Sequence, residues 1–208
     1  MKITSQSFTP GGVIASEFAM GKPVGDSFGF AGNRNPQLTF SQVPTAARSL
    51  VLLCVDPDVP TVAEMVGKSG VEIPVDQPRC DFVHWLMIDI AADCREIAAG
   101  ACSDGVTARG KHSPAGPVGS RQGLNDYTGW FAGDADMAGD YLGYDGPFPP
   151  PNDLRLHRYF FRLFALDIAA LPVPARFTAA QVQQAMKGHV LAEAVIWGSY
   201  SLHPGLRR

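Results

Sequence analysis

Residues 152–167 read NDLRLHRYFFRLFALD and contain one of three long apolar runs in the chain. Aromatic and aliphatic side chains dominate residues 158–166, which favours a β-strand. The other two runs are residues 49–55 (SLVLLCV) and residues 82–90 (FVHWLMIDI). Residues 49–55 are too continuously apolar for a strand with one face in water. The three runs therefore predict central strands of a β-sheet.

The composition also favours a mainly β protein. The chain of 208 residues has 22 glycines and 17 prolines, and only 18% of its residues are charged. Such a chain suits short strands joined by many turns better than a helical bundle. Residues 100–151 are rich in glycine and proline, and a structureless loop of that length is uncommon in a compact domain. We expect this region to be ordered and anchored by its aromatic residues, within one domain spanning residues 1–208.

Shorter elements are expected at both ends of the chain. Residues 3–8 and 13–18 flank a Pro-Gly-Gly turn and predict a hairpin, and residues 38–40 predict a further strand. Thr178 and Gln181 have the spacing of a capping box, and Gly188 is placed to end the helix that follows. Residues 192–200 fit either a closing strand or a second short helix.

Several classes of protein are disfavoured by charge and hydropathy. The net charge is −3 and there is no block of Lys or Arg, so we expect no nucleic-acid partner. No run approaches the roughly 20 apolar residues of a membrane span, and residues 1–18 lack the apolar centre of a secretory signal. The four cysteines show no C-x-x-C spacing. We expect four free thiols in a soluble, cytoplasmic protein; the alternative is a disulfide between two of Cys80, Cys94 and Cys102.

An acid and two histidines end or interrupt the apolar runs. Asp56 follows residues 49–55, where its carboxylate could orient an imidazole. His84 lies within residues 82–90 and is expected to share a face with Phe82, Leu86 and Ile88. A buried histidine bonded to a backbone carbonyl is the simpler interpretation of His84. His157 begins the third run.

The neighbours of these residues have structural interpretations. Asp58 lies in the sequence DPDVP, which favours a turn. Arg158 is flanked by apolar residues, so we expect it to pair with a carboxylate, that of Asp56 or Asp58. We assign Asp58 and Arg158 to structural support. Lys111 is expected to be a solvated loop charge.

Together, Asp56, His84 and His157 predict a polar pocket at a sheet edge. Such a set could hold an anion or a polar headgroup if the histidines are protonated or donate N–H. Backbone N–H groups in the turn at residues 143–147 could add donors.

These segments resemble the phosphatidylethanolamine-binding protein family, which includes the Raf kinase inhibitor proteins. The resemblance covers about residues 33–200 and is greatest to the bacterial branch. It is carried by DPDVP (56–60), FVHW (82–85), NDYT (125–128), GYDGPxPP (143–150), HRYFF (157–161) and FxLxALD (161–167). Several motifs in the right order make it specific.

The resemblance implies a large antiparallel sheet packed with a smaller one, and one or two short helices late in the chain. It also implies a pocket for phosphate, phosphorylated headgroups or simple carboxylates. The residues that match the pocket of the family are Asp56, Val59, Pro60, Phe82, His84, Gly146, Pro147, His157 and Tyr159.

Two departures from the family pattern limit what is carried over. Arg155 stands where the family often has glycine before His-Arg-Tyr. The chain ends soon after Tyr200, so no C-terminal helix that covers the pocket can be assigned. Lipid binding and kinase inhibition of the eukaryotic type are therefore not carried over, whereas bacterial relatives suggest a homodimer.

The sequence leaves three functions open. The first is a binding or regulatory protein that recognises a phosphate-like group on a small molecule or a protein, and so modulates a kinase or another signalling partner. The alternative is a hydrolase or lyase with a His–Asp pair as general base, but no G-x-S-x-G elbow or P-loop is present. Two histidines and a carboxylate could also hold zinc or iron, although they lack paired spacing. We expect a non-enzyme with no metal and no cofactor.

Overall fold

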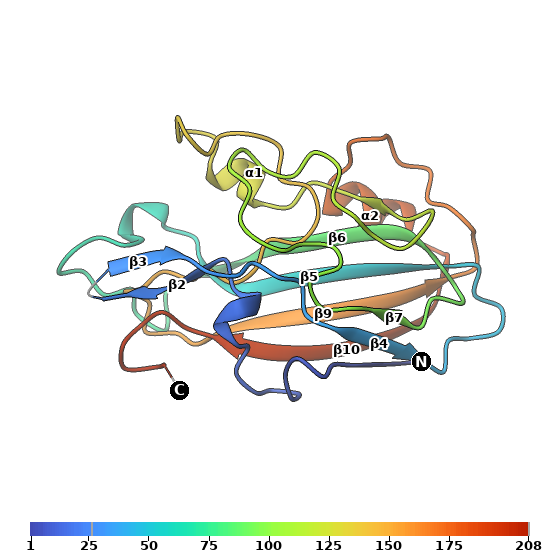
Figure 1. Ribbon diagram of the computed structural model, residues 1–208, viewed down its shortest axis with the longest axis horizontal. Helices are drawn as coiled ribbons and strands as arrows, with labels where there is room; N and C mark the ends of the chain where they lie inside the picture. The colour runs from blue at the N-terminus through green and yellow to red at the C-terminus, as the bar shows by residue number, and fades with distance from the viewer. Residues whose placement is uncertain (26, 208) are drawn as a thin grey trace.

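A five-stranded antiparallel sheet forms the centre of the computed structural model, which describes residues 1–25 and 27–207. Its strand order is β10-β9-β5-β6-β8 (Figure 1). The strands are β5 (Ser49–Pro60), β6 (Arg79–Ala91), β8 (Arg121–Gln122), β9 (His157–Leu166) and β10 (Val190–Tyr200). The three apolar runs thus become the adjacent strands β9, β5 and β6, which confirms the prediction that they are central.

The strand β5 is apolar throughout its first half because both of its faces are covered. Leu50, Leu52 and Cys54 pack in one core cluster, whereas Val51 and Leu53 pack in another. The second cluster is closed by α2 (Ala179–Ala185), which begins with the predicted capping box. Residues 192–200 belong to a strand, so the helical alternative for them is wrong.

Two smaller sheets complete the β structure. One has the order β1-β4-β7, formed by β1 (Lys2–Thr4), β4 (Leu38–Ser41) and β7 (Glu96–Ile97), and covers the first core. The other pairs β2 (Gly21–Val24) with β3 (Ser27–Phe30). The fold is therefore a large antiparallel sheet with smaller ones, as expected.

The prediction of an N-terminal hairpin is wrong. Ile3 pairs with Phe40 of β4, and Val13 forms a parallel bridge to Ser199 of β10. The Pro-Gly-Gly turn exists, but the N–H of Gly11 donates to the carbonyl of Trp197 at 2.8 Å. Both arms of the supposed hairpin thus pair with strands far away in the sequence. Residues 16–18 form the 3₁₀ helix η1 (Ser16–Phe18).

The glycine- and proline-rich region is ordered, as predicted. It contains α1 (Tyr127–Trp130), which lies near β6 in Figure 1. Tyr127, Tyr141 and Tyr144 are buried anchors, but Trp130 is 46% exposed and does not anchor the loop. The 3₁₀ helix η2 (Ala63–Met65) lies in the connection from β5 to β6.

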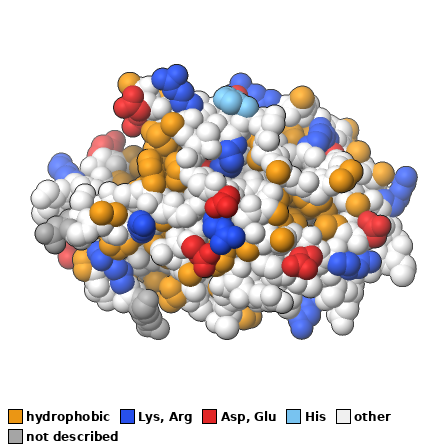
Figure 2. Space-filling model, in the orientation of Figure 1, with side chains coloured by type: hydrophobic (Ala, Val, Ile, Leu, Met, Phe, Trp, Pro, Cys, Tyr) orange, Lys and Arg blue, Asp and Glu red, His pale blue; other side chains and the backbone are white. Residues whose placement is uncertain are grey.

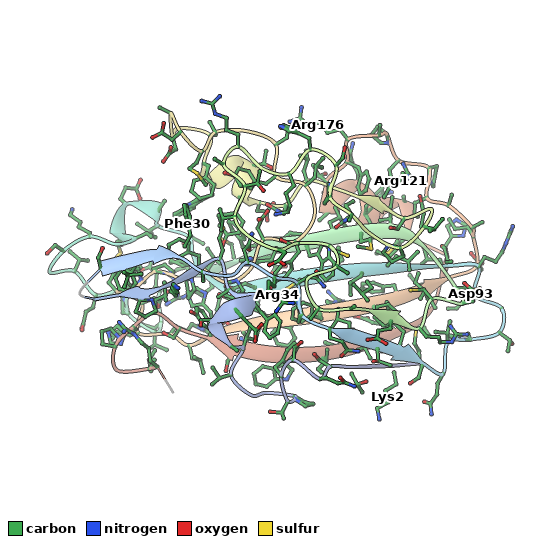
Figure 3. All side chains as sticks on the ribbon, viewed as in Figure 1. Lys2, Phe30, Arg34, Asp93, Arg121 and Arg176 are labelled. Carbon is green, nitrogen blue, oxygen red and sulfur yellow. The ribbon has the colours of Figure 1, made fainter. Side chains whose placement is uncertain are left out.

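The surface carries charges of both signs. Figure 2 shows acidic and basic side chains scattered over one face, and Arg34, near the middle of that face in Figure 3, pairs with Glu17 at 2.8 Å. Within residues 1–25 and 27–207, no helix has the length and apolar character needed to cross a membrane. All four cysteines are free.

Candidate ligand-binding site

A cavity of about 280 Å³ opens where β5, β6 and β9 carry their polar residues. Its floor is polar and buried: Asp56, His84, His157 and Tyr159 are at most 3% exposed. The remaining lining residues are Val59, Val66, Phe82, Tyr127, Trp130, Phe131, Phe148, Pro149, Pro150 and Pro151. The structure thus brings together the acid and both histidines that the sequence singles out.

A β-bulge aims His84 into the cavity. Trp85 pairs with Cys54 and Val83 pairs with Val55, so His84 is an extra residue in β6 with no partner on β5. A bulge redirects a side chain and breaks the alternation of faces. The expectation that His84 shares a face with Leu86 and Ile88 is therefore wrong, because those two residues pack in the second core.

The hydrogen bonds of His84 fix which ring nitrogen faces the ligand. Its Nδ1 lies 2.8 Å from the backbone carbonyl oxygen of Asp145. A carbonyl can only accept, so Nδ1 carries the proton. Burial lowers the pKa of His84, which is therefore neutral at pH 7. Its Nε2 is then an acceptor, and no group in residues 1–25 and 27–207 makes a hydrogen bond to it.

Asp145 holds His84 in place through a second layer of contacts. Its N–H donates to the carbonyl of His84 at 3.0 Å. Its buried carboxylate accepts from Lys111 Nζ at 2.6 Å and from the side chains of Asn33 and Asn125, each at 2.8 Å. The expectation that Lys111 is a solvated loop charge is wrong, since its side chain is only 13% exposed. Sequence reasoning missed Asp145, whose motif GYDGP indicated only a turn.

His157 is held between two carboxylates. Its Nδ1 lies 2.6 Å from Asp56 and its Nε2 lies 3.1 Å from Asp153. Burial alone would lower the pKa of His157, but the charges of Asp56 and Asp153 and the hydrogen bonds to them raise it to about 9. The ring is an imidazolium at pH 7, and both of its N–H groups are occupied. The prediction that Asp56 orients an imidazole is confirmed.

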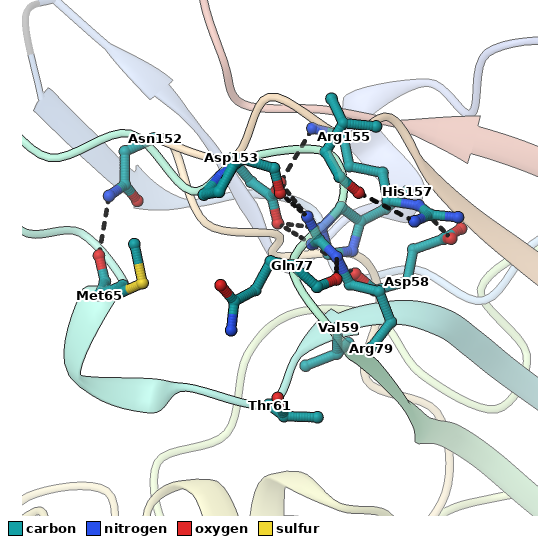
Figure 4. Close-up of polar contacts among 12 residues, drawn as sticks. Asp58, Val59, Thr61, Met65, Gln77, Arg79, Asn152, Asp153, Arg155 and His157 are labelled. Atoms are coloured by element: carbon teal, nitrogen blue, oxygen red, sulfur yellow. Dashed lines mark hydrogen bonds and ion pairs between the residues drawn. The ribbon is translucent and has the colours of Figure 1, made fainter.

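Asp153 is a residue of the site that sequence reasoning missed. It accepts from Arg79 at 2.5 and 3.1 Å as well as from His157 (Figure 4). Burial alone would raise the pKa of Asp153, but the hydrogen bonds from His157 and Arg79 outweigh that effect and lower it. The only signal in the sequence was a carboxylate four residues before His157, which has no special meaning outside a helix.

Asp58 lies within a strand and not in the predicted turn. β5 continues through Pro60, with an extra residue between Asp56 and Val59 relative to β6. The fully buried carboxylate of Asp58 pairs with Arg158 at 2.8 Å, so Asp58 is the one of the two expected carboxylates that binds Arg158. It also pairs with Arg155 at 2.8 Å (Figure 4), so the arginine at the family's glycine position closes an ion-pair network.

The other predicted pocket residues divide into two groups. Val59, Phe82 and Tyr159 line the cavity, whereas Pro60, Gly146 and Pro147 are absent from its lining. The N–H of Gly146 donates to Asn33 Oδ1 at 2.8 Å, so it is not a free donor for an anion. Gly146 is required by space, because a Cβ there would lie 2.2 Å from the carbonyl oxygen of Phe18.

Tyr159 supplies the floor with a donor. Its hydroxyl is buried and has no hydrogen-bond partner among the described residues. Burial and the charge of Asp56 raise the pKa of Tyr159 well above its usual value, so the phenol stays neutral. A buried hydroxyl without a partner is rare because it costs free energy, and a bound ligand would satisfy it.

The floor therefore offers one free acceptor, His84 Nε2, and one free donor, the hydroxyl of Tyr159. Its fixed charges cancel in pairs, Asp56 with His157 and Asp153 with Arg79. Over the described part of the chain, no group of three or more His, Cys, Asp or Glu side chains is arranged to hold a metal ion.

Comparisons with known proteins agree on one family. The family model described as "Phosphatidylethanolamine-binding protein" matches residues 4–201. A UPF0098 protein of Chlamydia muridarum is 31% identical over 96% of this chain and 98% of its own length. A UPF0098 protein of Methanothermobacter thermautotrophicus is 33% identical over 81% of this chain and 83% of its own.

Two solved structures share the fold. One is CT736 from Chlamydia trachomatis, described as a putative phosphatidylethanolamine-binding protein homologue, with a TM-score of 0.62 and 27% identity over 96% of both chains. The other is YbcL of Escherichia coli, described as a member of the mammalian family, with a TM-score of 0.69 and 25% identity over 96% of this chain and 97% of its own.

Proposed function

The chain belongs to the phosphatidylethanolamine-binding protein family, and we propose that it is a binding protein whose cavity holds the phosphate group of a small phosphorylated ligand. One observation carries this proposal: the buried side chains of His84 and Tyr159 line one cavity, and neither His84 Nε2 nor the Tyr159 hydroxyl has a hydrogen-bond partner among the described residues. A tetrahedral phosphate has several oxygens and can meet both groups at once.

Binding of phosphate requires a proton. Neutral His84 presents a lone pair, and a dianionic phosphate has no hydrogen to donate to it. Either His84 takes a proton from solvent, or phosphate enters as its monoanion and donates its own. In both cases the complex holds one proton between His84 Nε2 and a phosphate oxygen, so affinity falls as pH rises.

The hydrolase or lyase alternative is less well supported. It needs a His–Asp pair as general base, but His157 is already protonated at pH 7 and both its nitrogens are bonded to carboxylates. Such a ring cannot accept a proton from a substrate. His84 could accept one, but no serine, threonine or cysteine lines the cavity within the described part of the chain.

We also propose a class of protein partner, a cellular location and an assembly state. A phosphorylated side chain on a protein presents the same group as a small phosphorylated molecule, so a kinase or signalling partner could be recognised through this cavity. Residence in the cytoplasm and assembly as a homodimer are also proposed. Sedimentation velocity tests assembly: twice the monomer mass supports the dimer, and the monomer mass at all concentrations contradicts it.

Isothermal titration calorimetry with inorganic phosphate at pH 8 tests the site. Titrations in two buffers with different heats of ionisation should show uptake of about one proton, because inorganic phosphate is mainly a dianion at this pH. His84→Ala should abolish binding, and replacement of the exposed His112 in the control His112→Ala should leave it unchanged. Unaltered binding by His84→Ala would refute the proposal.

A further inference from the structure

The cavity has an outer part whose chemistry differs from that of its floor. The outer walls are formed by Val66 after η2, by Trp130 and Phe131 at the end of α1, and by Phe148 with the prolines that follow it. These segments lie far apart in the sequence and share an apolar character. Among the described residues that line the cavity, the charged and titratable side chains other than tyrosine belong to the floor.

Polar and apolar parts are arranged by depth. The floor residues Asp56 and His84 are 1% and 3% exposed, whereas Trp130 at the rim is 46% exposed. Tyr127 joins the two parts, since its ring stacks on Phe131 with centroids 5.6 Å apart and meets His84 at 5.5 Å. A phosphate that reaches His84 would therefore lie beside aromatic and proline surface.

The volume limits what can occupy the outer part. A cavity of about 280 Å³ lies at the lower end of the roughly 300–1,000 Å³ of sites that hold drug-sized ligands. A phosphate on the floor therefore leaves space beside it for a small group, such as one ring or a short alkyl chain.

We propose that the ligand is a phosphate monoester with a single small apolar group, held with its phosphate on His84 and Tyr159 and its apolar group between Trp130, Phe131 and Phe148. This inference rests on the proposed function, since it needs the phosphate to bind at the floor. It adds that the apolar walls, and not the floor, discriminate among phosphate esters.

Titration calorimetry with three probes tests this inference: inorganic phosphate, glycerol 3-phosphate and phenyl phosphate. Burial of one ring against apolar walls should make phenyl phosphate bind about tenfold more tightly than glycerol 3-phosphate. Trp130→Ala should remove about fivefold of this preference for phenyl phosphate over glycerol 3-phosphate. The control Val195→Ala alters a residue that is also 46% exposed but does not line the cavity, and should change nothing.

The outcomes separate the two proposals. Equal affinities for the three probes would overturn the inference and leave the phosphate site intact. A preference for phenyl phosphate that survives in both Trp130→Ala and Phe131→Ala would also overturn it. No binding of any probe would overturn the phosphate site and this inference together. Trp130→Ala changes an exposed side chain, and an unchanged circular dichroism spectrum would verify that it folds.

Discussion

His157 donates its Nδ1 hydrogen to the carboxylate of Asp56 at 2.6 Å, and this bond joins the start of β9 to the second half of β5. Asp153 occupies the other nitrogen of the ring. The two histidines of the cavity therefore have opposite roles. His157 is a charged structural group with both nitrogens occupied, whereas His84 is neutral and has one nitrogen free for a ligand.

The stability of the protein should depend on the charge of His157. Its pKa is about 9 in the folded protein, against about 6.5 for an unperturbed histidine. Because the folded-state pKa is the higher one, this stabilisation is fully present below pH 6.5 and is lost as pH rises through 9. The difference corresponds to on the order of 3 kcal/mol.

Urea denaturation from pH 6 to pH 10 measures this effect. The free energy of unfolding of the wild type should fall more steeply with pH than that of His157→Gln, and the control His112→Gln, at an exposed histidine, should follow the wild type. Parallel curves for the wild type and His157→Gln would show that His157 carries no such charge.

Lys111 should set the proton affinity of His84 without contacting it. Lys111 neutralises the buried carboxylate of Asp145, and the charge of Asp145 is one of the influences that raise the pKa of His84. Lys111→Met should therefore raise the pKa of His84, measured by NMR titration of the ring. It should also lower the free energy of unfolding by about 3 kcal/mol, because a buried charge loses its partner. The exposed Lys68 provides the control Lys68→Met, and an equal pKa in both variants would contradict the prediction.

Asp58 should matter more for stability than either arginine that it binds. Its carboxylate is fully buried, whereas the side chains of Arg155 and Arg158 are 34% and 41% exposed. Asp58→Ala should lower the free energy of unfolding by about 3 kcal/mol. Arg155→Gln should cost about 1 kcal/mol or less, since solvent screens its charge and Arg158 remains. Chemical denaturation checks both values, and a larger loss in Arg155→Gln would contradict the account.

Gly146 should not tolerate a side chain. A Cβ at this position would lie 2.2 Å from a backbone oxygen of Phe18, so the backbone would have to move. Gly146→Ala should lower the free energy of unfolding by about 2 kcal/mol. Gly133→Ala is the matched control, because a Cβ there meets no atom within 4 Å. Thermal denaturation that finds equal melting temperatures for the two variants would refute the prediction.

The central sheet and the acid and two histidines of the pocket could be predicted from the sequence because both follow from local patterns. Continuous apolar runs identified β5, β6 and β9, and the polar residues that end or interrupt them identified Asp56, His84 and His157. The N-terminal hairpin failed because β1 pairs with β4 instead of the next segment along the chain. The Pro-Gly-Gly turn is compatible both with a hairpin and with the observed pairing of β1 with β4.

The remaining parts of the site depend on contacts between distant segments. The bulge at His84 is visible only in the register of β6 against β5. Lys111 reaches Asp145 across 34 residues and Arg79 reaches Asp153 across 74, and neither spacing has a signature in sequence. These contacts decide which histidine is free, which residue types alone could not show.

The most direct test of the phosphate site is a ¹H–¹⁵N NMR titration of the histidine rings with inorganic phosphate at pH 7. Before addition, His84 should show the neutral form with its proton on Nδ1, and His157 should show the charged form. Phosphate should shift Nε2 of His84 toward the protonated value until saturation and leave the charge state of His157 unchanged. Absence of any response at His84, or loss of the proton from His157 on binding, would contradict the account.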